Sequence, residues 1–259
     1  MRRWSAAAGP AGALGLVVFL LLAPAARAQE SSALSRGRAR LEVGDWSGAL
    51  MVLRAGLPAG DRDPALHGAL ARAYSEFGED APAGSSTQKV SYRTALDHAL
   101  RELELAPSSA QAHLDVAVVT GKIASVSGAR TKLRLAPTVA DEARAAIRLD
   151  GDLWQAYHVL GEWNLQIATL GGFKKFGASL MGGLPEASLE DAIANFETAR
   201  DLAPGSIRNS LALGRAYLAA ERERDGRQEL EKAIRLPPTQ PRDPELKRQA
   251  RQELADLGS

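Results

Sequence analysis

Apolar and small residues repeat along the second half of the chain at a fixed interval. Four positions in residues 191–206, DAIANFETARDLAPGS, meet a similar residue 34 positions later: Ala192 and Gly226, Phe196 and Leu230, Ala199 and Ala233, and Pro204 and Pro238. The apolar members of each copy recur at the three- and four-residue steps of one α-helical face. An interval of this length predicts a pair of antiparallel helices as the repeating unit.

The segment between the two prolines indicates which kind of helical pair repeats. Four of its residues, and four in the preceding copy, occupy the W-x₂-L-G-x₂-Y positions of a tetratricopeptide repeat: Ser210, Leu213, Gly214 and Tyr217, and Tyr157, Leu160, Gly161 and Asn164. Glycine at these positions lets two helices approach, and proline ends a helix. We therefore expect an all-α protein, a tetratricopeptide-like right-handed solenoid of four to five helical hairpins with a C-terminal capping helix after Pro238.

Looser copies precede these two and extend the helical-repeat domain over residues 29–259. A first unit lies in SRGRARLEVGDWSGAL, a second opens near His67 and a third near Ala110. Three interruptions predict loops or insertions at about 78–90, 124–138 and 167–187, because they are rich in glycine, serine or proline. The second interruption can also extend either neighbouring helix. The third carries several large apolar residues, so part of it is expected to pack on the solenoid.

The N-terminus has the pattern of a secretory signal peptide over residues 1–28. Arg2 and Arg3 precede an apolar stretch over about residues 13–23, and small residues at Ala26 and Ala28 offer a cleavage site. The sequence thus predicts export, to the periplasm or the medium, with an uncleaved membrane anchor as the alternative. The chain contains no cysteine, which excludes disulfides and thiol chemistry. The 29 basic and 31 acidic side chains after residue 28 give no basic excess, so no nucleic-acid partner is expected.

No motif in the sequence indicates catalysis. The four histidines lack the H-x₃-H spacing of a ligand pair, and H-E-x-x-H is absent: His67, His98, His113 and His158. His67 falls on a helix seam, where we expect a hydrogen-bonded core histidine. GASLMG, residues 177–182, has the wrong glycine spacing for a nucleophile elbow, and Ile123 stands where a phosphate loop needs Ser or Thr. We expect no catalytic residues, no metal and no cofactor.

Residues from about His113 to Leu257 resemble a known family. The segments LGEWNLQIATL, GLPEASLEDAIANFETARDLAPG and ALGRAYLAAERERDGRQELEKAIRLP are similar to the helical-repeat domain of the regulator of microtubule dynamics family. The resemblance implies a curved all-helical domain that binds proteins, and in some members phospholipid, without catalysis. Animal members associate with microtubules or with mitochondrial and reticulum membranes. A signal peptide departs from that pattern, so this chain is interpreted as an exported bacterial form.

The first helix of each tetratricopeptide unit lines the concave surface, so exposed positions there are the candidate groove for a protein or peptide. They are Gln111, Leu114, Val118, Gln155, His158, Glu162, Arg208, Leu211 and Arg215. A second candidate, for contact with a membrane or phospholipid, is the FKKF segment: Phe173, Lys174, Lys175 and Phe176. The leading hypothesis is a non-enzymatic scaffold with a protein partner. The alternatives are a lipid or hydrophobic-ligand carrier and an enzyme whose site is not recognisable.

Overall fold

A computed structural model describes residues 33–57, 62–170 and 187–258 of the chain. Helices and short connections make up these residues, and none of the described residues forms a strand. The predicted signal peptide, residues 1–28, and the FKKF segment lie outside the described residues. No helix among the described residues has both the length and the apolar character that a membrane span requires.

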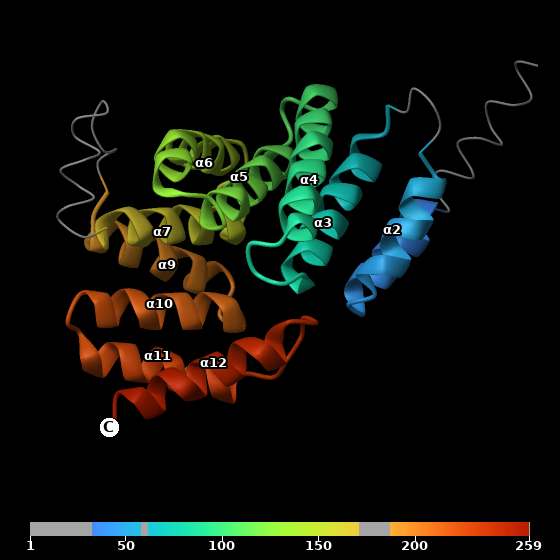
Figure 1. Cartoon of the computed structure of the whole chain (residues 1–259). Coiled ribbons are helices and arrows are strands. Elements are labelled where there is room, and N and C mark those ends of the chain that lie inside the picture. The colour runs from blue at the N-terminus through green and yellow to red at the C-terminus, as the bar shows by residue number, and fades with distance from the viewer. Residues whose placement is uncertain (1–32, 58–61, 171–186, 259) are drawn as a thin grey trace, which may run out of the picture.

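The helices follow one another as antiparallel pairs that stack side by side (Figure 1). Residues 33–42 are helical and pair with the helix that follows them. The helices after them are α2 (Trp46–Ala55), α3 (Pro64–Asp80), α4 (Ser86–Leu105), α5 (Ala110–Ser125), α6 (Ala129–Leu149), α7 (Trp154–Ala168), α9 (Leu189–Leu202), α10 (Ile207–Ala219), α11 (Glu223–Arg235) and α12 (Asp243–Asp256). The described residues thus form a tetratricopeptide-like solenoid of five hairpins capped by α12, and the predicted fold class is confirmed.

Side-chain caps fix where many of these helices begin. The hydroxyls of Ser85, Ser109 and Ser206 accept hydrogen bonds from backbone N–H groups in the first turns of α4, α5 and α10. Each such cap contributes about 1 kcal/mol to helix stability. At the other end, α9 stops at Leu202, two residues before Pro204, because proline cannot donate the hydrogen bond that a longer helix requires.

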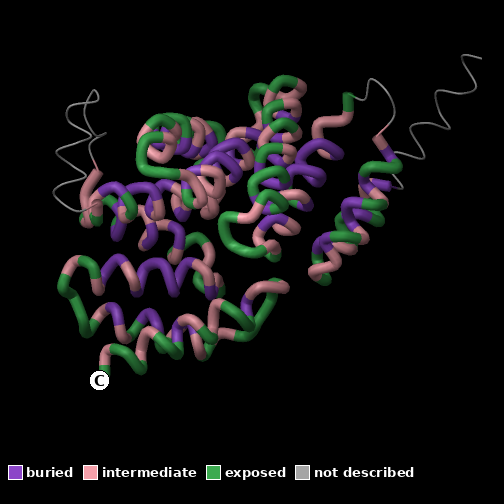
Figure 2. Tube along the Cα trace, viewed as in Figure 1, coloured by how far each residue is buried: buried purple, intermediate pink, exposed green. Residues whose placement is uncertain are grey.

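The repeat glycines lie at the seams between helices, as the sequence predicts. A Cβ added to Gly161 would lie 2.8 Å from ring atoms of Phe196, which is fully buried. A Cβ on Gly214 would lie 3.0 Å from the side chain of Leu230 and 3.2 Å from the carbonyl oxygen of Gly226. Buried residues therefore face one another between the helices, while the outer faces stay exposed (Figure 2).

Two of the three predicted loops are largely helical, so those predictions are wrong in extent. Helix α3 continues to Asp80 and α4 starts at Ser86, which leaves a short turn where a loop over 78–90 was expected. Buried Gln88 and Tyr92 pack this part of α4 against α3, and that packing outweighs the Gly- and Ser-rich composition. Of the interruption over 124–138, only residues 126–128 separate α5 from α6, so the alternative that it extends the neighbouring helices is confirmed. The third loop, about 167–187, lies mostly outside the described residues.

Candidate functional site

The inner curve of the solenoid encloses a cavity of about 1340 Å³. Its wall comes mainly from the first helices of successive hairpins: residues 33–42, α3, α5, α7 and the start of α10. One face of α6 adds apolar surface through Ala136 and Val139. Residues 239–243, which precede α12, complete the wall, and we call them the closing segment. The volume of this cavity is larger than that of most small-molecule sites and can hold a segment of another protein chain.

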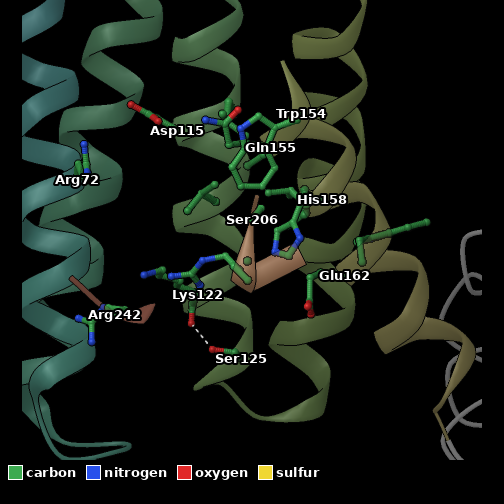
Figure 3. A pocket seen from close by; sticks show the side chains of 18 of the residues that line it. Arg72, Asp115, Lys122, Ser125, Trp154, Gln155, His158, Glu162, Ser206 and Arg242 are labelled. Atoms are coloured by element: carbon green, nitrogen blue, oxygen red, sulfur yellow. Dashed lines mark hydrogen bonds between the residues drawn. The ribbon is translucent and has the colours of Figure 1, made fainter. Parts of the chain in front are cut away.

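The cavity contains most of the predicted groove residues. Seven line it: Gln111, Leu114, Val118, Gln155, His158, Glu162 and Arg208. Two of these were expected to be exposed and are buried, Leu114 at 3% and His158 at 9% exposure, because neighbouring helices pack over them. The seven come from α5, α7 and the first turn of α10, so the structure brings together residues that lie far apart in the sequence. Figure 3 shows Gln155, His158 and Glu162 along one face of α7, with Lys122 opposite. Whether these residues bind a protein stays a prediction.

Two of the predicted groove residues do not lie in the cavity. Leu211 was expected to be exposed, and this is wrong: it is 1% exposed and belongs to a core cluster with Leu230 and Ala250. Arg215 donates hydrogen bonds to Glu253, at 2.5 and 2.9 Å. In both cases the reason is α12, which covers this face of α10. Helix α10 is the first helix of the last hairpin, and α12 covers the face that the first helices of the earlier hairpins turn toward the cavity.

Arg242 joins the closing segment to α3 across the mouth of the array. Its Nε lies 2.5 Å from a carboxylate oxygen of Glu76, and its Nη2 donates to the Glu76 carbonyl at 2.8 Å and lies 3.1 Å from Asp80. The guanidinium also stands 5.6 Å above the ring of Trp46, a cation–π contact. Arg242 and Glu76 expose only 19% and 18% of their side chains. The contact is therefore shielded from water, and Figure 1 shows the segment approaching the ends of α2 and α3.

Lys122 of α5 adds a second cation to the same carboxylates. Its Nζ pairs with Glu79 and lies 3.6 Å from Glu76. Burial works to raise the pKa of Glu76, but Lys122 and Arg242 hold that pKa below its usual value. Glu76 is thus ionised at neutral pH and holds two cationic side chains at the cavity wall.

The imidazole of His158 is fixed by a chain of buried hydrogen bonds. The Nδ1 atom lies 3.0 Å from Oδ1 of Asn209, and Nδ2 of Asn209 donates to the Phe196 carbonyl at 2.8 Å. The aromatic neighbours Trp154 and Phe196 stand 6.1 and 5.5 Å from the imidazole, centroid to centroid. Burial lowers the pKa of His158, so the ring is neutral at neutral pH.

Two acidic side chains, Glu102 of α4 and Asp115 of α5, lie together at the cavity wall. Asp115 lines the cavity and accepts a hydrogen bond from Nε2 of Gln111 at 2.7 Å. Burial, the nearby Asp115 charge and a hydrogen bond to Asp115 raise the pKa of Glu102 to about 8. Burial likewise raises the pKa of Asp115 to about 6. The absence of a side chain at Gly68 makes room for the Glu102 carboxyl, since a Cβ there would lie 2.7 Å from it.

The two N-terminal histidines form a pair that sequence spacing does not reveal. The Nδ1 atoms of His67 and His98 lie 2.9 Å apart, and Tyr74 stacks on His98. His67 is buried, as expected for a seam position. The described residues contain no group of three or more His, Asp or Glu side chains placed to hold a metal ion.

Several residues of the cavity wall carry no signal in the sequence. Arg242 and Asp115 are neither periodic nor part of a motif, and Arg242 lies in the tail after Pro238. Lys122 precedes Ile123 in a segment that does not match a phosphate loop. Their roles depend on which helix ends meet around the curve, and that follows from the superhelical geometry of the whole array.

The fold and the cavity define a class: a tetratricopeptide-like solenoid with a walled inner surface. A similar structure is that of a thermophilic TPR protein from Thermus thermophilus, with a TM-score of 0.65 and 17% identity over 87% of this chain and 99% of that one. At this identity the likeness concerns the fold alone. Residues 38–258 match the family described as regulator of microtubule dynamics protein 1-3, and the chain belongs to that family.

Curated relatives agree with this assignment. Regulator of microtubule dynamics protein 1 of Mus musculus is 26% identical over 190 residues, which are 73% of this chain and 62% of the mouse protein. Regulator of microtubule dynamics protein 3 of Bos taurus is 27% identical over 212 residues, which are 81% of this chain and 44% of the bovine protein. The match spans less than two thirds of each of these relatives, so it concerns only part of their length.

Proposed function

We propose that this chain is an exported, non-enzymatic scaffold that holds a segment of another protein in its inner cavity. The observation that carries the proposal is the cavity of about 1340 Å³ built from the concave faces of the repeats. Stacked helical repeats commonly use this face for binding. The N-terminal pattern of residues 1–28 supports export, and the proposal therefore does not extend to microtubules, despite the names of the relatives.

The chemistry of the cavity wall suits a peptide. Apolar surface from Val118, Val139 and Ile167 alternates with polar side chains of α7 and α10. Among the described residues, Glu162 and Arg208 have neither a hydrogen-bond partner nor an ion-pair partner. Unpaired polar groups beside apolar pockets match the mixture of main-chain polar groups and side-chain anchors that an extended peptide presents.

Site-specific crosslinking tests the proposal. A photoreactive residue replaces Gln155, which lines the cavity, or Arg93, which is exposed on α4 away from it, in the full-length chain expressed in its native cells. We expect the Gln155 position to capture one or a few defined proteins that the Arg93 control does not capture. Identical protein patterns at the two positions would contradict the proposal. N-terminal sequencing of the recovered chain tests export, with cleavage after Ala28 expected.

A hydrophobic-ligand carrier is the second candidate. The observation in its favour is a contiguous apolar part of the wall, formed by Val139, Trp163, Ile167 and Leu170. Lipid that copurifies with the full-length chain, at a fixed molar ratio measured by mass spectrometry, would support the carrier. A variant with Leu170→Asp, at a partly exposed position of this wall, should lose that lipid while keeping its helical circular-dichroism spectrum. The crosslinking experiment separates the two candidates, because a carrier would yield lipid adducts at Gln155.

A further inference from the structure

The hydrogen bonds around His158 determine which of its nitrogens carries the proton. Asn209 donates through Nδ2 to the carbonyl oxygen of Phe196, so its Oδ1 is the atom that faces Nδ1 of His158. An amide oxygen only accepts, and Nδ1 must therefore donate. In a neutral imidazole one nitrogen carries the proton, so the Nε2 atom of His158 is left as an acceptor.

The acceptor at Nε2 is available to a ligand. His158 lines the cavity, and among the described residues its Nε2 has no hydrogen-bond partner. It is also absent from the set of fully buried polar atoms that lack a partner, which are Ser75 Oγ, Glu102 Oε2 and Glu229 Oε2. Nε2 of His158 has no partner and is not fully buried, so it is accessible from the cavity that His158 lines. Figure 3 shows the imidazole at the wall, between α7 and the first turn of α10.

A carboxylate without a partner among the described residues lies on the same helix face as this acceptor. Glu162 follows His158 by one helical turn on the same face of α7 and also lines the cavity. The Glu162 carboxylate raises the pKa of the His158 imidazole and the Arg208 guanidinium lowers it, so both groups lie close enough to act on the ring. A lone pair beside a carboxylate favours an N–H group that carries positive charge and disfavours an anion.

We propose that His158 and Glu162 together form a recognition point for a lysine or arginine side chain of the bound protein segment. The proposal rests on the proposed scaffold function and specifies the chemistry of its partner. Nε2 of His158 accepts one hydrogen bond from the ammonium or guanidinium, and the Glu162 carboxylate neutralises its charge. Asn209 is a positioning residue, because its amide holds the imidazole in the tautomer that accepts.

A double-mutant cycle between protein and peptide tests this pairing. Random linear peptides displayed on phage are selected against the full-length chain, and the recovered peptides are synthesised. We expect them to share a lysine or arginine. Replacing that residue by methionine, or replacing Glu162 by glutamine, should each weaken binding about tenfold or more, while the two changes together cost little more than one. Glu231→Gln on the outer face of α11 is the matched control and should change nothing.

The outcomes separate this proposal from the scaffold function. Peptides that bind without a required basic residue, peptides that depend on an acidic one, or additive effects in the cycle would overturn the recognition point and leave the scaffold standing. Failure to select any peptide above the level of a blank surface would overturn both.

Nitrogen-15 NMR of the histidine rings gives an independent readout. In the free protein, the Nε2 resonance of His158 should be that of an unprotonated ring nitrogen and the Nδ1 resonance that of a protonated one, with Nε2 shifting when the selected peptide is added. A protonated Nε2 in the free protein would overturn the proposal whatever the peptides show. His158→Phe, which keeps an aromatic ring against Trp154 and Phe196, identifies the resonances.

Discussion

Replacing Gly161 with alanine measures how tightly the helices of one repeat are packed. Both Gly161 in α7 and Gly121 in α5 lie inside helices, where alanine is favoured over glycine by about 1 kcal/mol. Only the first position is crowded: its added Cβ would lie 2.8 Å from the ring of Phe196, whereas nothing stands within 4 Å of a Cβ at Gly121. The two substitutions therefore share the same propensity gain and differ in packing.

The expected magnitudes follow from that difference. Gly121→Ala should stabilise the protein by about 1 kcal/mol. In Gly161→Ala the buried ring of Phe196 must move, and overpacking of this kind costs about 1–3 kcal/mol, which cancels or exceeds the same gain. The two variants should therefore differ by about 1–3 kcal/mol in the free energy of unfolding.

Urea denaturation followed by far-ultraviolet circular dichroism measures this difference, with the slopes of the transitions compared to check that the variants unfold alike. Adding Phe196→Leu to Gly161→Ala should cost less than the sum of the two single effects, because the smaller side chain relieves the overlap. Equal stabilities for the Gly121 and Gly161 variants would refute the view that this glycine is required by helix contact.

Two further predictions concern the cavity wall. A double-mutant cycle of Arg242→Met and Glu76→Gln, measured by chemical denaturation, should give a coupling energy of about 1–3 kcal/mol, because the pair is largely shielded from water. Additive effects of the two substitutions would contradict a bond between the closing segment and α3. Glu102 has its pKa raised to about 8, above the value of 4.5 expected when unfolded, so the folded state holds its proton more tightly and stability falls as pH rises through this window. As pH rises from about 5 to 9, the free energy of unfolding of Glu102→Gln should therefore increase relative to the wild type by about 1–3 kcal/mol, after allowance for solvent screening. Parallel curves of unfolding free energy against pH for the two proteins would show that the pKa of Glu102 is not raised.

The sequence was sufficient for the local part of the architecture. Repeat residues such as Gly161, Gly214 and Phe196 mark where helices touch, because close approach demands small residues and a seam demands apolar ones at the helical period. Composition was a poorer guide to connections. The stretch with Ser85 and Gln88 has the glycine and serine content of a loop, yet a serine cap and burial against α3 make most of it helix.

The cavity was predictable only as far as the repeat pattern is regular. Gln155, His158 and Glu162 follow from the rule that first helices face inward, and they line the cavity. Leu211 follows the same rule and is buried, because α12 occupies the space that a further repeat would leave open. Arg242 could not be found from the sequence at all, since its partner on α3 lies 166 residues away.

The contact between Arg242 and Glu76 changes the mechanics that a repeat array would otherwise have. In an open array each unit interacts only with its neighbours, so a change at one end acts directly on the adjacent repeat alone. Here Arg242 and Glu76, 166 positions apart, are bonded, so the C-terminal end of the array is joined directly to its second hairpin. Truncation before residue 239 should therefore loosen the second hairpin as well as the last. Breaking this contact should therefore change the width of the cavity as well as the stability of the C-terminal helix.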